Sequence, residues 1–204
     1  MTTITISRQF GAGGRTLGKK LAKRLGYYCA DDVMVKEVAD RMNVSPKEVE
    51  GFEKEGASNL MKILDRFLSG DYISRLISDR YGYVYEKKYV DSVKSIIQGL
   101  HNQGNVVIIG RGSQYILQDE KDVFHILLVR DFDDRVNFLV NKYDISDVSD
   151  ARKTVTRADR LRGNFLSFFT GNENHDDPIS YDLTINMKRV SMDKALHLIL
   201  GMLS

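Results

Sequence analysis

A run of glycines and cations near the start of the chain has the residue types of a phosphate-binding loop. Residues 8–16 read RQFGAGGRT and stand between a strand-like run and an amphipathic basic helix pattern. Glycines permit the positive φ angles that turn successive N–H groups inward, and the following helix adds about half a positive charge at its N-terminus. Such a concavity binds phosphate. The residues expected to hold a nucleotide here are Arg8, Gly11, Ala12, Gly13, Gly14, Arg15 and Thr16.

The loop departs from the P-loop pattern GxxxxGK[ST]. When residues 14–16 are aligned with GKT, Gln9 stands at the first glycine and Arg15 at the lysine. The guanidinium group of Arg15 or Arg8 could supply the charge of the missing lysine, and the hydroxyl of Thr16 could bind Mg²⁺. A tight structural connection is the alternative interpretation of this turn.

Further chemical groups follow two other strand-like runs. Asp31 and Asp32 come directly after residues 27–30. One of the two is a natural helix N-cap, while a second carboxylate there could orient an acceptor or a water bound to Mg²⁺. Arg111 comes after the apolar run 105–109. An arginine just beyond the carboxyl end of a buried strand points into the crevice where α/β sheets bind ligands. Asp31, Asp32 and Arg111 are therefore the candidate substrate-binding residues.

A second cationic cluster, RADRLR at residues 157–162, lies in a helical pattern that Ser146 or Ser149 could cap. A charge run is usually a solvated helix face. Together with a glycine loop and a cleft arginine, however, it favours phosphoryl transfer, which needs several cations around the moving group. Asp159 would then orient its neighbours by charge-assisted hydrogen bonds. The candidate catalytic residues are Arg15, Arg157, Arg160 and Arg162.

Strand-like and helical patterns alternate along the chain and predict the elements that hold these groups. Alternating or continuous apolar residues mark five strands, and glycines bound several of them. Such an order predicts an α/β fold with a mostly parallel sheet and right-handed crossovers. The five strands are expected to begin at Thr3 and to lie at 27–30, 105–109, 123–129 and 181–186, with helices at 132–142 and from Ser191.

The segment of about 45–100 reads as helical throughout, so one domain, 1–204, is expected to contain a helical insertion there and a lid region at about 146–178. Ser45 to Glu48 forms a capping box. Arg80, the tyrosines of 81–85 and Lys87-Lys88 could stack on a base and hold a monophosphate; a solvated aromatic connection explains them equally well. The insertion could also be the interface of a homodimer.

Composition excludes several classes of function. The 30 basic and 28 acidic residues leave a net charge of +2, so no nucleic-acid partner is expected. One cysteine, Cys29, allows no internal disulfide, and no apolar stretch approaches the roughly 20 residues of a membrane span. We expect a cytoplasmic protein. Four scattered histidines support neither a zinc site nor a histidine-activated nucleophile.

The motifs, taken in order, resemble those of bacterial cytidylate kinases. The matching stretches are GAGGRTLGKKLAKRLGYYCAD, the later GRG and the RADRLR helix, and the opening ISRQFGAGGRTLG is similar to the divergent cytidylate kinase-like family. This resemblance implies a three-layer P-loop NTPase fold with a lid helix. It also implies ATP with Mg²⁺ on the glycine loop, a nucleoside monophosphate on Arg111, and lid arginines from Arg157 onward that bridge donor and acceptor.

The chain departs from that family pattern where base and ribose would be recognised. The aspartate expected after the matched GR is Gly112, and an acidic and a basic residue of the lid helix fall on Leu161 and Asn164. The serine expected after the second-strand aspartate is Asp32. The expected function is phosphoryl transfer from ATP to a nucleoside monophosphate, CMP or dCMP first. The alternatives are a kinase for another small molecule, a nucleotide-binding regulatory protein without turnover, and an interaction protein.

Overall fold

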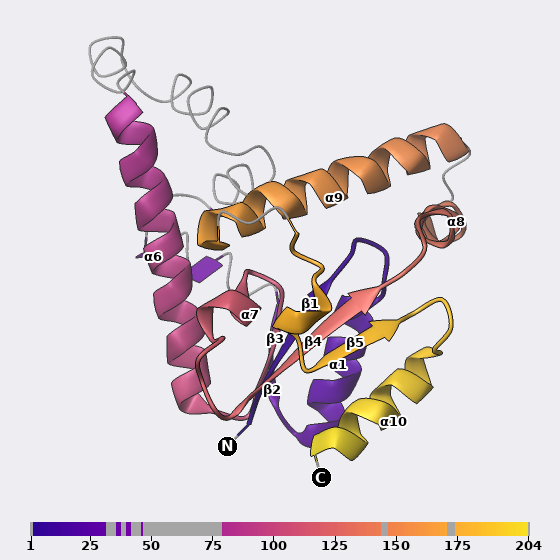
Figure 1. Ribbon diagram of the computed structural model, residues 1–204, viewed down its shortest axis with the longest axis horizontal. Helices are drawn as coiled ribbons and strands as arrows, with labels where there is room; N and C mark the ends of the chain where they lie inside the picture. The colour runs from indigo at the N-terminus through magenta and orange to yellow at the C-terminus, as the bar shows by residue number, and fades with distance from the viewer. Residues whose placement is uncertain are drawn as a thin grey trace.

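A five-stranded parallel sheet lies at the centre of the structure (Figure 1). Its strands are β1 (Thr3–Arg8), β2 (Tyr28–Ala30), β3 (Val106–Ile109), β4 (Val123–Val129) and β5 (Leu183–Asn186). Their order is β2-β3-β1-β4-β5, and β1 pairs in parallel with both β3 and β4, Ile4 lying beside Val107 and Phe124. The predicted parallel sheet is confirmed, although the second and fifth strands begin later than expected, at Tyr28 and Leu183.

The computed structural model describes part of the chain. The described residues are 2–31, 36, 37, 40, 41, 46, 79–143, 147–170 and 174–203, without the side chains of 79–86, 142 and 143. The predicted capping box at 45–48 and the side chains of Arg80 and the tyrosines of 81–85 lie outside this description, as does Asp32. It stays a prediction that residues 1–204 form one domain with a helical insertion at about 45–100 and a lid region at about 146–178.

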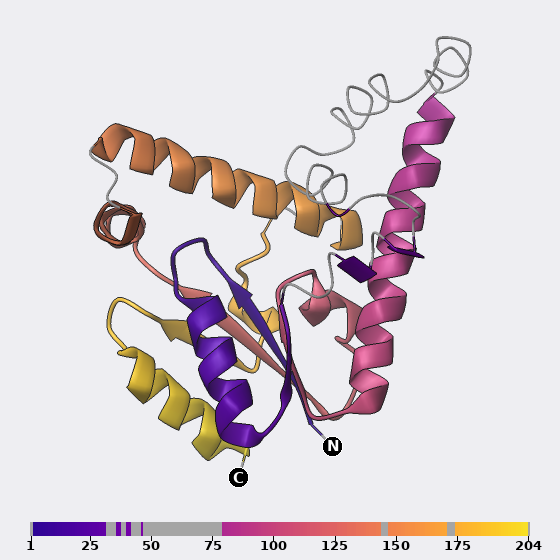
Figure 2. The same cartoon turned by 180° about the vertical axis from the view of Figure 1, so that it is seen from behind.

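Helices cover both faces of the sheet. They are α1 (Gly14–Leu25), α6 (Asp79–Gln103), α7 (Ser113–Ile116), α8 (Phe132–Tyr143), α9 (Val148–Thr170) and α10 (Met192–Leu203), with a 3₁₀ turn η1 (Pro178–Ser180). Seen from behind, α1 and α10 lie together over one face, and α6 lies at the other (Figure 2). Val107 and Ile109 of β3 pack in the core under α1 and α10, whereas Val106 and Ile108 pack under α6. Successive side chains of a strand point to opposite faces of the sheet, so β3 contributes residues to both cores.

The apolar face of α6 matches the sequence pattern. Val90, Val93, Ile96 and Ile97 are all buried, and they join the core on this side of the sheet. Lys87 and Lys88 are exposed. Among the described helices, none is both long and apolar enough to cross a membrane.

Two buried threonines of β1 explain two of the histidines. Thr3 Oγ1 lies 3.0 Å from His101 Nδ1, and Thr5 Oγ1 lies 2.7 Å from His125 Nδ1. These hydrogen bonds satisfy polar groups inside the sheet. The described residues contain no cluster of metal-ligating side chains. His101 and His125 therefore have hydrogen-bonding partners within the fold.

The α9 helix passes above the carboxyl ends of the strands (Figure 1). Asp147 precedes it, and its Oδ1 accepts a hydrogen bond of 2.7 Å from the N–H of Ser149. Ser149 itself lies within the helix, so the prediction that it caps α9 is wrong, and Ser146 lies outside the described residues. Aspartate and serine cap helices about equally well, which is why the sequence pattern did not separate them.

Candidate phosphate-binding cleft

The glycine loop connects β1 to α1 through backbone conformations that suit glycine. Gly11 and Gly13 have φ angles of 84° and 90°, in the left-handed region that other residues rarely enter. A Cβ atom on Gly14 would lie 2.7 Å from Cγ of Arg8, so Gly14 lets the loop pack directly on that side chain. α1 begins at Gly14 without a side-chain cap. Its first N–H groups are thus left to a ligand or to water.

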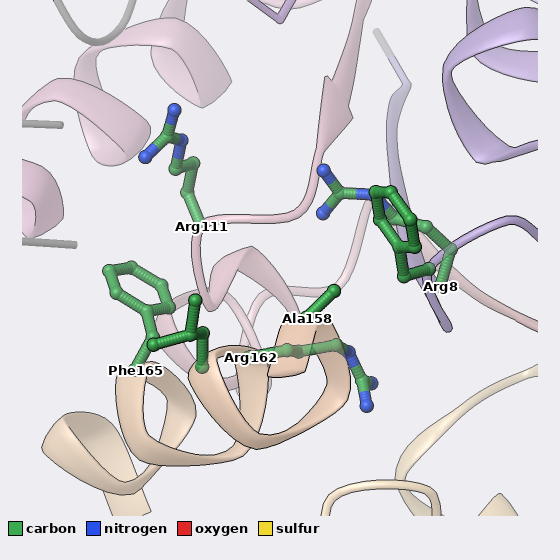
Figure 3. Close-up of a pocket in the computed structure, with 7 residues that line it drawn as sticks. Arg8, Arg111, Ala158, Arg162 and Phe165 are labelled. Carbon is green, nitrogen blue, oxygen red and sulfur yellow. The ribbon is translucent and has the colours of Figure 1, made fainter. Parts of the chain in front are cut away.

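A cleft of about 280 Å³ opens between this loop, the end of β3 and the α9 helix. Figure 3 shows Arg8, Arg111 and Arg162 reaching it from three different elements, with Phe165 beside Arg162 on α9. The lining residues are Arg8, Phe10, Arg111, Ala158, Leu161, Arg162 and Phe165. The cleft therefore combines three guanidinium groups with an apolar wall.

The pKa of Arg8 reflects the positive charge that is concentrated in this cleft. Its pKa is lowered from the usual arginine value to about 10, first because the guanidinium group is removed from water, and then because Arg111 and Arg162 repel it. Arg15 acts in the same direction, and Asp31 opposes it. An anion in the cleft would relieve this repulsion. The cleft is thus built to receive negative charge.

Arg111 sits in a strained turn. Gly110, Arg111 and Gly112 have φ angles of 75°, 60° and 68°, so an L-residue with a long side chain occupies a left-handed position between two glycines. Such a conformation costs on the order of 1–2 kcal/mol. A Cβ atom on Gly110 would overlap Nη1 of Arg8. Because Gly110 has no side chain, the guanidinium group of Arg8 lies directly against this turn.

We expect Arg111→Gly to be more stable than Arg111→Ala by about 1 kcal/mol, because glycine alone enters this turn without strain. Both variants remove the guanidinium group, so the difference isolates the backbone. Urea unfolding measures it. At the exposed helical position Lys23 the order should reverse, since glycine is the poorer helix former there. Equal stabilities of the two Arg111 variants would show that the turn is not left-handed in solution.

Arg162 is the cluster arginine that the structure brings into the cleft. Its Nη2 donates to Ser7 Oγ at 3.1 Å and pairs with Asp176 Oδ1 at 2.8 Å. The side chain is 18% exposed. Arg157 and Arg160 are exposed and do not line the cleft. Their predicted catalytic role stays a prediction.

Arg15 and Asp31 form an ion pair beside the loop. Arg15 Nε lies 2.6 Å from Asp31 Oδ2, and Lys19 Nζ lies 3.7 Å from the same oxygen. Asp31 is 8% exposed. The carboxylate at the end of β2 is therefore held by two cations, and the hydroxyl-bearing Thr16 is exposed in the first turn of α1.

The sequence pattern missed Arg135, which is buried in α8. Its Nη1 donates to both carboxylate oxygens of Asp159 at 2.8 Å and to the carbonyl of Phe10 at 3.2 Å. Gly11 packs against it, since a Cβ there would lie 3.3 Å from that of Arg135. Asp159 thus binds a residue of another helix, and the prediction that it orients its own helix neighbours is wrong. A lone arginine in an amphipathic pattern gave no signal of this contact.

Mg²⁺ fits what the site offers. Magnesium in nucleotide enzymes is held by one or two protein oxygens together with substrate phosphates and waters. An exposed hydroxyl at Thr16, next to a glycine loop, is such a ligand.

Comparison with known proteins gives a match to one family model. The model described as the cytidylate kinase-like family matches residues 3–189. No curated protein matches the chain.

Solved structures resemble this one along nearly its whole length. An uncharacterized protein from Eubacterium ventriosum is 18% identical with a TM-score of 0.63, covering 99% of this chain and 98% of its own. Shikimate kinase from Acinetobacter baumannii, in complex with shikimate, is 13% identical with a TM-score of 0.52, covering 100% and 93%. Deoxyadenosine kinase from M. mycoides with bound dATP is 13% identical with a TM-score of 0.50, covering 99% of each chain. At these identities the likeness shows the fold alone, which is that of P-loop NTPases.

Proposed function

The chain belongs to the cytidylate kinase-like family, and on this premise we propose that it transfers the γ-phosphoryl group of ATP to a nucleoside monophosphate, CMP or dCMP first. Its family and its fold are those of nucleotide and small-molecule kinases. The finer choice of acceptor depends on the chemistry of the cleft.

The observation that carries the proposal is the convergence of Arg8, Arg111 and Arg162 on one cleft. A hydroxyl acceptor needs a group that takes its proton, whereas a phosphate acceptor is already ionised and needs cations and positioning. Guanidinium groups match phosphate oxygens as paired donors. The cleft therefore favours an acceptor that already carries a phosphate.

Arg8 is the better candidate to replace the missing lysine. It lines the cleft and packs against Gly14, whereas Arg15 holds Asp31 at the end of β2. In this assignment the nucleotide phosphates lie on residues 11–16 with Mg²⁺ on Thr16. Asp31 and Arg15 then form one wall of the acceptor site. Arg15 as the lysine replacement remains the alternative.

Arg162 would stabilise the transferred phosphoryl group, since it reaches the cleft from the helix that crosses the strand ends. Arg157 and Arg160 contribute only when α9 moves over the bound nucleotides, as lids do in kinases. Closure of this kind would also exclude water. Arg111, at the end of β3, would hold the acceptor phosphate.

The test is consumption of ATP with Mg²⁺ in the presence of CMP, dCMP, UMP, AMP, GMP or dTMP, each against a control without acceptor. We expect turnover with at least one monophosphate, highest with CMP or dCMP, and none with a hydroxyl acceptor such as shikimate or a nucleoside. Turnover with a hydroxyl acceptor alone would contradict the phosphate assignment. ATP binding without any turnover would favour a regulatory nucleotide-binding protein. Mass measurement in solution tests the homodimer.

A further inference from the structure

Gln9 stands at the first glycine of the phosphate-loop pattern when Gly14 is taken as the second, and Arg8 stands there when Gly13 is; in either register the structure gives Gln9 a role. The backbone N–H of Gln9 donates to the carbonyl of Leu128 at 3.1 Å, which fixes the start of the loop to β4. A glycine at this position would offer no side chain. The amide of Gln9 instead reaches two partners that are far away in the sequence.

Both ends of this amide are occupied. Its Oε1 accepts a hydrogen bond of 3.0 Å from the N–H of Arg130, and its Nε2 donates to Asp176 Oδ2 at 2.8 Å. The N–H of Arg130 can only donate, so it fixes which end of the amide is oxygen. The amino end must therefore face Asp176, and the pair needs a donor on Gln9 and an acceptor on Asp176.

The second oxygen of Asp176 continues the chain of contacts to α9. Its Oδ1 pairs with Nη2 of Arg162 at 2.8 Å, and the same nitrogen donates to Ser7 Oγ. Arg162 lines both the phosphate-binding cleft and a neighbouring cavity of about 220 Å³, which Gln9 and Asp176 also line. A guanidinium with two fixed acceptors loses less conformational freedom when it meets a ligand.

We propose that Gln9 and Asp176 form a clip that positions Arg162 for the transferred phosphoryl group. The proposal rests on the proposed function of the cleft. Gln9 and Asp176 touch neither nucleotide in this scheme; they act through Arg162. The clip also joins the glycine loop to the residues after α9, so that the loop and the lid arginine keep a common geometry. A misplacement of a catalytic group by about 1 Å can cost about 10²-fold in rate.

The clip can be tested by exchanging the amide and the carboxylate: Gln9→Glu combined with Asp176→Asn leaves the number of charges unchanged. Gln9→Glu removes the donor that faces Asp176 and sets two carboxylates against each other. Asp176→Asn either sets two amino groups against each other, or keeps the bond to Gln9 with its oxygen and turns its amino group toward Arg162, which loses its acceptor. In the double variant, the carboxylate at position 9 accepts from the N–H of Arg130 and from the amide at position 176, whose oxygen accepts from Arg162. Both hydrogen bonds of the side chain at position 9 are restored, with the donor and acceptor of the central pair exchanged, and an oxygen of residue 176 again faces Arg162.

We expect each single variant to lower kcat about 10–100-fold with KM for ATP changed by less than about 3-fold. The double variant should return to within about 5-fold of the wild-type kcat. Gln103→Glu, at an exposed position of α6, adds the same charge elsewhere and should leave kcat unchanged. If the factors by which the two single variants lower kcat simply multiply in the double variant, the proposed clip is wrong. If a single variant does not fold, recovery of a cooperative unfolding transition in the double variant tests the same pairing.

A double-mutant cycle between Gln9 and Arg162 tests whether Gln9 positions Arg162 or only supports the fold. If the clip acts through Arg162, then Gln9→Glu should change kcat by less than about twofold in an Arg162→Ala background. An equal loss in both backgrounds would show that the clip only supports the fold. Binding of pyrophosphate, measured by calorimetry across the same cycles, keeps the test independent of the acceptor. Absence of turnover in the wild type would refute the proposed function, while non-additive pyrophosphate affinities would still support the clip.

Discussion

Replacing Arg162 by alanine is expected to lower kcat by about 10³-fold or more, while ATP continues to bind. An arginine that meets the transferred phosphoryl group contributes about 10³ to 10⁵ in rate in phosphoryl-transfer enzymes. Arg162 reaches the cleft, and its guanidinium group is already held by Ser7 and Asp176. Since its contribution appears mainly in the transition state, kcat should fall more than the affinity for ATP. Steady-state kinetics with the best acceptor of the panel measure both.

Lys153→Ala is the matched control for this experiment. Lys153 lies on the same helix, is 74% exposed and pairs with Asp150 one turn away. Removing an exposed cation of this kind should change kcat by less than about twofold. A variant of Arg162 that kept wild-type kcat would assign the lid role to Arg157 or Arg160 and would require α9 to move. Alanine variants of these two arginines then identify the residue.

Replacing Arg8 by methionine should stabilise the ligand-free protein and abolish tight binding of ATP. Methionine fills most of the same space without the charge. The wild-type side chain bears a guanidinium that is withdrawn from water and repelled by Arg111 and Arg162, and its pKa of about 10 reflects both effects. Removing a poorly compensated charge from such a place can raise the free energy of unfolding by about 1–2 kcal/mol. The phosphates lose a paired donor at the same time, so the affinity for ATP should fall about 100-fold.

Urea unfolding and calorimetry with Mg²⁺-ATP, in a buffer without phosphate or sulfate, measure the two changes. Arg24→Met is the control, because Arg24 is exposed in the last turn of α1 and should show neither change. Arg8→Lys keeps a charge but loses the paired donors, and should fall between the two. A less stable Arg8→Met protein that still bound ATP tightly would contradict the proposed role of Arg8. Stability and binding that move in opposite directions are expected of a site organised for a ligand.

The features that could be predicted from the sequence are those that leave a local pattern of residue types. The sheet could be predicted because β3 is a continuous apolar run bounded by glycines, and because isoleucines alternate with threonines in β1. Gly11 and Gly13 could be predicted for the same reason, since a positive φ leaves a signature in residue type. Arg111 could be placed at the sheet edge because it comes directly after a strand.

The contacts that connect the site were beyond the sequence pattern. Gln9 and Asp176 meet although they lie 167 positions apart, and Arg135 meets Asp159 across two helices. A hydrogen bond between distant residues leaves no period and no motif. The RADRLR run predicted a cationic helix, but which of its arginines lines the cleft, Arg162, was decided by how α9 lies over the strands.

The position of β1 at the centre of the sheet also sets an order of events during synthesis. β1 leaves the ribosome before its partners on both sides, Val106–Ile109 and Val123–Val129, which follow it by about a hundred residues. At about 5–20 residues per second, this apolar strand waits on the order of ten seconds for its neighbours. Pairings between such distant segments form slowly. The strand that leads into the glycine loop is therefore translated early and assembled late, so the loop can be fixed in place only after β3 and β4 have been made.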